Sequence, residues 1–125
     1  MMNNKRPKNL NLLTIRFPIP AIISILHRIS GIFLFLLFPF LLYLFGLSLS
    51  SEADFNKVQS FLTTPVVKFL VWLFLVPLFY HLVAGIRHLL MDVHIGEELE
   101  SGRRGAKLTL LISIIIIVLS GVWLW

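Results

Sequence analysis

The chain alternates long apolar runs with short polar stretches, and each apolar run is as long as a membrane span. Residues 29–51 carry no formal charge over 23 positions, and a helix needs about 20 residues to cross a hydrocarbon core about 30 Å thick. Uncharged runs also occupy residues 69–86 and 108–125. The pattern predicts an all-α integral membrane protein. Three transmembrane helices are expected, at residues 20–49, 65–91 and 106–125.

The polar stretches predict how these helices are connected. Residues 1–19 are basic and then mixed, so we expect an arm near the membrane surface that ends where Pro20 enters the first turn of a helix. Residues 93–107 are charged and contain three glycines, which predicts a loop. Pro39 and Pro77 fall inside helices and are expected to kink them.

The remaining connection, residues 50–64, predicts a short helix at the membrane interface. Ser51 and Asp54 have the spacing of a capping box, in which the first side chain caps the start of a helix. Thr64 followed by Pro65 predicts the N-cap and first position of the next transmembrane helix.

The composition is typical of a membrane protein and excludes sites that depend on cysteine. The 125 residues form a single domain, and 58% hydrophobic against 14% charged residues lies outside the range of soluble proteins. The chain has no cysteine, so it holds no disulfide, thiolate zinc site or iron–sulfur cluster of its own. Its net charge of +5 lies beside the apolar runs, which indicates contact with membrane lipid and not nucleic acid. No removable signal peptide is expected.

The basic residues also predict an orientation. The arm and the second connection hold four each, whereas the first connection has two. Because cytoplasmic loops are enriched in Lys and Arg, the N-terminus is expected to be cytoplasmic and the C-terminus periplasmic. The residues counted are Lys5, Arg6, Lys8 and Arg16; Arg87, Arg103, Arg104 and Lys107; and Lys57 and Lys68.

Candidate chemistry begins with His81, the single imidazole of an uncharged run. A histidine in hydrocarbon is costly without a partner. His81, Gly85 and His88 share one helix face, and Gly85 leaves room for a flat group, so this face suits a b-type haem with an axial histidine. Other interpretations are that His81 bonds a neighbouring helix, that His88 faces headgroups, and that Asp92 is a solvated loop carboxylate.

A second group lies at the start of the first predicted helix, on the same side of the membrane. Ser24, His27 and Arg28 bring a hydroxyl, an imidazole and a guanidinium together within about one helical turn of each other. A serine and an arginine suit the carbonyl oxygens of a quinone, and arginine also pairs with a carboxylate such as a haem propionate. Alternatively, Arg28 binds a lipid phosphate and Ser24 bonds its own helix backbone.

With these residues the chain closely resembles the cytochrome b membrane-anchor subunit (C subunit) of bacterial succinate dehydrogenase, the succinate:ubiquinone oxidoreductase of respiratory complex II. The resemblance covers nearly the whole chain. Its most specific part pairs Ser-x-x-His-Arg-x-Ser-Gly with His-x-x-x-Gly-Ile-Arg-His-x-x-x-Asp. The matching segments are Arg6-Pro7, Asn9-Leu10, residues 13–18, residues 24–31, His81, residues 85–88 and Asp92.

This resemblance implies a role for each matching position. His81 matches the histidine that ligates the haem b iron, the other axial ligand coming from a second small anchor subunit. Ser24 and Arg28 match residues of the ubiquinone site, and His27 and Arg28 match residues near the haem propionates. Gly85, His88 and Asp92 are motif positions that support the site. His94 belongs to no motif and is expected to be a loop histidine.

The resemblance also implies the setting of the protein. It would be a multi-pass protein of the bacterial inner membrane, assembled with a second anchor subunit, an iron–sulfur subunit and a flavoprotein that carries FAD. In the electron transport chain and tricarboxylic acid cycle, it would pass electrons from succinate to ubiquinone without catalytic residues for succinate oxidation. Two alternatives remain open: a small transporter or proton-path subunit that uses the intramembrane histidines, and an assembly factor without a cofactor.

Overall fold

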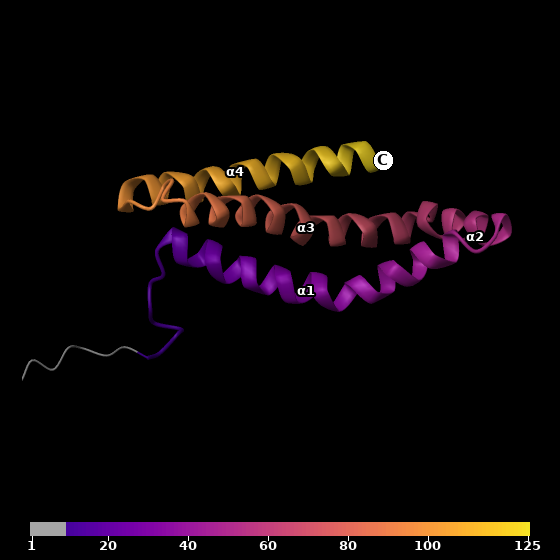
Figure 1. Cartoon of the computed structure of the whole chain (residues 1–125), viewed down its shortest axis with the longest axis horizontal. Helices are drawn as coiled ribbons and strands as arrows, with labels where there is room; N and C mark the ends of the chain where they lie inside the picture. Colours follow the sequence, from indigo (N-terminus) through magenta and orange to yellow (C-terminus); the bar gives the residue numbers. More distant parts are fainter. Residues whose placement is uncertain (1–9) are drawn as a thin grey trace, which may run out of the picture.

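The structure is a computed structural model and describes residues 10–125, so the basic residues Lys5, Arg6 and Lys8 lie outside it. These residues form four α-helices and no strand: α1 (Ile19–Ser48), α2 (Glu52–Thr63), α3 (Pro65–Asp92) and α4 (Leu99–Leu124). Figure 1 shows α1, α3 and α4 as three long, roughly parallel rods with α3 in the middle, and α2 at the end where α1 turns into α3. The prediction of an all-α fold is confirmed.

The three long helices are each long and apolar enough to cross a membrane. Most of their large apolar side chains are exposed in the isolated chain, as expected of surfaces that face lipid or another membrane subunit. Pro39 and Pro77 lie in the interiors of α1 and α3, and α1 is visibly bent in Figure 1.

A small core joins the helices at the end where α3 connects to α4. Ile23 of α1, Ala84 of α3 and Ala106 of α4 are completely buried there. Tyr80 donates a hydrogen bond from its hydroxyl to the carbonyl oxygen of Ile23 at 2.7 Å, which ties α3 to α1. Small side chains allow the helix backbones to approach closely, and in a membrane this packing replaces the hydrophobic effect as the source of association.

The prediction of a loop through residue 107 is wrong in its second half, because α4 begins at Leu99 and not at residue 106. Buried Arg87 of α3 donates to the carbonyl oxygen of Gly102 at 3.2 Å. The small residues at the start of α4 let this guanidinium lie against the helix: an added Cβ at Gly105 would stand 3.5 Å from the Arg87 Nε atom. Glycines that indicated a loop are therefore sites of close helix packing.

The true connection between α3 and α4 is short. His94 and Gly96 adopt positive φ values of 65° and 79° there, and the His94 ring lies 2.8 Å from the Glu97 carboxylate. His94 is thus a loop histidine, as expected.

The predicted interfacial helix is present as α2, and Ser51 caps it by accepting a hydrogen bond from the Asp54 amide at 3.1 Å. The expected side-chain cap of α3 is absent. Thr64 occupies the N-cap position, but its hydroxyl donates to the Ser60 carbonyl oxygen at 3.1 Å, near the end of α2 where carbonyls lack a helical N–H partner.

Candidate functional site

Three imidazole rings from two helices lie together between α1 and α3. The rings of His27 (α1) and His81 (α3) stack with centroids 4.1 Å apart and planes inclined by 15°. The ring of His88, two turns further along α3, lies 5.0 Å from His27 and is tilted by 48°. The predicted face of α3 therefore meets a histidine of α1, which joins the two groups of candidate residues.

His81 is held by hydrogen bonds at one ring nitrogen. Its Nδ1 atom lies 2.9 Å from the Ser30 hydroxyl oxygen and 3.2 Å from the His27 carbonyl oxygen. Its Nε2 atom has no hydrogen-bond partner within residues 10–125. His81 is partly exposed, and this nitrogen is not among the fully buried unpaired atoms. A histidine bonded through Nδ1 presents Nε2 to an external group, which is the usual arrangement of a metal ligand.

His27 contributes a different kind of atom. Among residues 10–125, its Nε2 is the one fully buried side-chain nitrogen or oxygen that lacks a hydrogen-bond partner. A buried polar atom left unpaired costs about 1–3 kcal/mol, so such atoms in folded proteins usually mark a bound group or a function. The His27 ring faces Gly85, where an added Cβ would stand 3.4 Å from this nitrogen. The space expected beside Gly85 is filled by the His27 imidazole.

The other predicted site residues form no hydrogen bond, ion pair or ring contact with this cluster among residues 10–125. Ser24 is half-buried on α1, and Arg28 is exposed with no ion pair to a described residue. Asp92 is the exposed last residue of α3. Ser24 and Arg28 therefore remain available to a group outside the chain.

The sequence indicated no part in the site for Ser30, Tyr80 or Arg87. Ser30 lies one turn from His27 and bonds His81 directly, and this spacing is a signal that the sequence already contains. Tyr80 and Arg87 bond backbone carbonyls of other helices, and nothing in the local sequence indicates such partners. Arg87, counted among the basic residues that set the orientation, is buried inside the protein.

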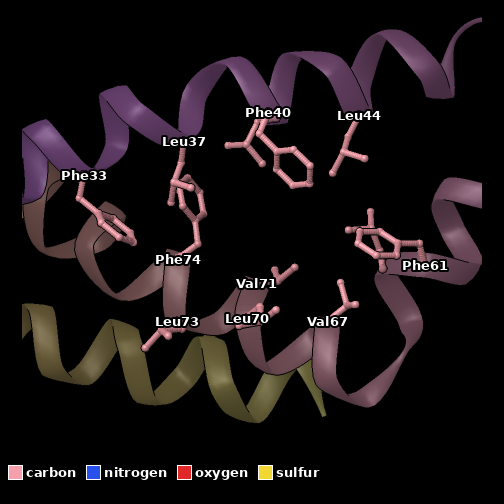
Figure 2. Close-up of a pocket in the computed structure, with 12 residues that line it drawn as sticks. Phe33, Leu37, Phe40, Leu44, Phe61, Val67, Leu70, Val71, Leu73 and Phe74 are labelled. Atoms are coloured by element: carbon pink, nitrogen blue, oxygen red, sulfur yellow. The ribbon is translucent and has the colours of Figure 1, made fainter.

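The helices enclose an apolar cavity and an apolar groove, and only the groove reaches a residue that contacts the imidazoles. A cavity of about 350 Å³ lies between α1, α2 and α3. Figure 2 shows the aliphatic and aromatic side chains that line it, such as Phe40, Leu44, Phe61 and Phe74. Its lining among residues 10–125 is apolar and holds no ionisable side chain. A more open groove of about 480 Å³ between α1 and α3 reaches Ser30 and Tyr80.

The residues present fit one half of a haem site. Among residues 10–125, no group of three or more His, Cys, Asp or Glu side chains is placed to hold a metal ion. A haem iron needs only two axial ligands, and His81 offers one accessible nitrogen. His81 would therefore fit as one ligand of a haem iron.

Comparisons with known proteins show what the chain is similar to. The sequence model of the family described as "Succinate dehydrogenase/Fumarate reductase transmembrane subunit" matches residues 2–120. A succinate dehydrogenase cytochrome b556 subunit of Coxiella burnetii is 45% identical over 125 residues, which cover 99% of this chain and 100% of that protein. The subunit of the same name from Rickettsia bellii is 34% identical over 78% of this chain and 76% of its own length. That of Paracoccus denitrificans is 29% identical over 92% of this chain and 88% of its own length.

Proposed function

The chain belongs to the succinate dehydrogenase/fumarate reductase transmembrane subunit family, and from that premise we propose that it binds haem b jointly with a second anchor subunit and forms part of the ubiquinone-reduction site. The family match confirms the resemblance to the cytochrome b anchor subunit of succinate dehydrogenase. In this proposal, electrons from succinate reach ubiquinone at the membrane, while FAD and the iron–sulfur clusters lie in partner subunits.

The orientation of His81 is the observation that carries the haem proposal. His81 would hold the haem iron through its Nε2 atom, because its Nδ1 atom bonds Ser30 and the His27 carbonyl while Nε2 has no partner among residues 10–125. When bound, haem b supplies a one-electron redox centre. The ring is also tied to a second helix, so its direction is set before the haem binds.

His27 and Arg28 are proposed to serve the haem propionates. The His27 ring stacks on that of His81, so it lies beside the proposed haem. Arg28 follows His27 and is exposed, so its guanidinium is free to reach an anion outside the chain. Gly85 and His88 pack against the ring of His27. Asp92, at the exposed end of α3, is proposed to support the same site from the membrane surface.

Ser24 and Arg28 are proposed to line the ubiquinone pocket. They lie four residues apart on α1, hence on one face of the helix, and neither is fully buried. The Ser24 hydroxyl donates to a carbonyl oxygen of the quinone headgroup, and Arg28 holds positive charge beside it. We propose that this end faces the cytoplasm of a bacterial inner membrane, where the iron–sulfur subunit docks.

Optical spectra of the purified membrane complex test the proposal. The wild-type complex is expected to give a haem b band in the reduced-minus-oxidised spectrum, and His81→Ala is expected to lose or alter it. His94→Ala is the control, because His94 lies in the loop outside the cluster and pairs with Glu97. His88→Ala tests the other histidine on the same face of α3 as the iron ligand. A normal band in His81→Ala together with its loss in His88→Ala would contradict the assignment. A wild-type complex without the band would favour a proton path or an assembly role.

A further inference from the structure

Ser30 occupies an unusual position for a buried serine. It is 6% exposed, and its hydroxyl bonds a side chain on another helix as well as its own backbone. The other buried serines of the described chain, Ser113 and Ser120, bond only carbonyl oxygens within α4. That local bond is the common state of a serine in a transmembrane helix. The contact of Ser30 with His81 is therefore a separate feature that its helix does not require.

The directions of the bonds around Ser30 determine which nitrogen of His81 carries the proton. The Ser30 hydroxyl donates to the His27 carbonyl oxygen at 2.8 Å, so its oxygen offers a lone pair to His81. The His27 carbonyl, 3.2 Å from the His81 Nδ1 atom, is able only to accept. Both neighbours of Nδ1 are thus acceptors, and we assign the hydrogen to Nδ1 on this basis. The Nε2 atom then carries the lone pair.

The next residue, Gly31, makes this arrangement possible. A Cβ atom at Gly31 would stand 3.0 Å from the Cε1 atom of His81, closer than carbon atoms pack in a protein interior. The ring therefore lies directly on the backbone of α1, within reach of the Ser30 hydroxyl. One turn of α1, from His27 to Gly31, provides both the space and the acceptors for the His81 ring.

We propose that Ser30 is a positioning residue for the iron ligand: its hydroxyl holds His81 in the Nδ1-protonated form, with Nε2 directed outward, and increases the electron donation of the ring to the iron. The inference rests on the proposed function, because it concerns the same haem. A hydrogen bond accepted from the distal N–H makes an imidazole a stronger donor, and a stronger donor favours the oxidised iron. Ser30 thereby lowers the reduction potential of the haem.

The test measures the haem midpoint potential and the low-spin electron paramagnetic resonance spectrum of the purified complex. Ser30→Ala is expected to retain haem with a raised midpoint potential and shifted g values, because the His27 carbonyl remains as a single acceptor. Ser30→Thr keeps the hydroxyl and is expected to restore both values toward wild type. Ser113→Ala removes another buried hydroxyl, from α4, and is expected to change neither.

Two results would overturn the positioning role. One is a wild-type potential and spectrum in Ser30→Ala. The other is an equal change in Ser30→Ala and Ser30→Thr, which would assign the effect to packing and not to the hydroxyl. Failure of the proposed function is seen separately, since it would appear as a wild-type complex without haem or as a His81→Ala complex with an unchanged spectrum.

Discussion

The imidazole rings of His27 and His81 stack face to face across two helices, with centroids 4.1 Å apart. Each histidine precedes a glycine by four residues in its own helix, and each ring faces the glycine of the other helix: His27 faces Gly85, and His81 faces Gly31. Because α1 and α3 run in opposite directions (Figure 1), the same spacing in both helices brings each ring opposite a glycine. The orientation of His81 consequently depends on α1 as much as on α3.

The orientation of the chain in the membrane is the first prediction. A reporter fused after Ser51 is expected to report the outside, and one fused after Gly96 the inside. The reason is that the basic residues concentrate at the start of α4, and basic residues favour the cytoplasmic side. Gly96 is the suitable fusion point because Gly102 lies buried inside α4. The reverse pattern would place the Ser24 and Arg28 region on the periplasmic side.

The proposed quinone contacts predict a selective loss of activity. Ser24→Ala and Arg28→Leu are expected to lower quinone reduction by roughly ten- to hundredfold, since a lost buried hydrogen bond costs about 1–3 kcal/mol. Succinate oxidation with a soluble dye acceptor is expected to stay near wild type in the same preparations. Ser48→Ala, at the opposite end of α1, is the control. Unchanged quinone reduction in both variants would remove these residues from the site, and equal loss with both acceptors would indicate faulty assembly.

The contact of Trp72 with α4 predicts that Gly121 does not tolerate a side chain. The Trp72 indole donates to the Ile117 carbonyl oxygen at 3.1 Å, and a Cβ at Gly121 would stand 2.9 Å from the same indole nitrogen. Gly121→Ala is therefore expected to destabilise the complex by about 1–3 kcal/mol, measured by thermal unfolding in detergent. Gly46→Ala is the control, because nothing lies within 4 Å of its added Cβ. Equal stability of the two variants would contradict this account.

The cap of α2 predicts a pH dependence outside the membrane-spanning helices. Hydrogen bonds from Lys57, Ser50 and Ser51 lower the pKa of the Asp54 carboxyl from 3.8 to about 2. Because the folded pKa lies below the unfolded one, the stabilisation of α2 is complete above about pH 4 and is lost as the pH falls toward 2. A carbon-detected NMR titration of Asp54 is expected to show the low midpoint.

Two lysine variants test the cause of this shift. Lys57→Met is expected to raise the Asp54 midpoint, since the Lys57 ammonium lies 2.8 Å from the carboxylate. Lys68→Met leaves the described contacts of Asp54 in place and is expected to have no effect. A midpoint that is the same with and without Lys57 would show that this ion pair does not set the pKa.

Features that depend on neighbours in the chain could be predicted from the sequence. The three spans follow from the length of the uncharged runs, and the start of α2 follows from the spacing of Ser51 and Asp54. Both are local properties, because hydropathy and capping involve residues within one turn or one helix. The side of α3 that carries the imidazoles was predictable for the same reason, since His81 and His88 share one face.

The start of α4 and the environment of His81 were decided by tertiary structure. Gly102 and Gly105 favour a loop when read alone, and they belong to a helix because Arg87 of α3 lies against them. Likewise, the sequence places a histidine in the membrane but does not determine which groups bond it. Ser30 and the His27 carbonyl meet His81 only when α1 and α3 pack together, because a contact over more than fifty residues depends on helix packing and leaves no local pattern.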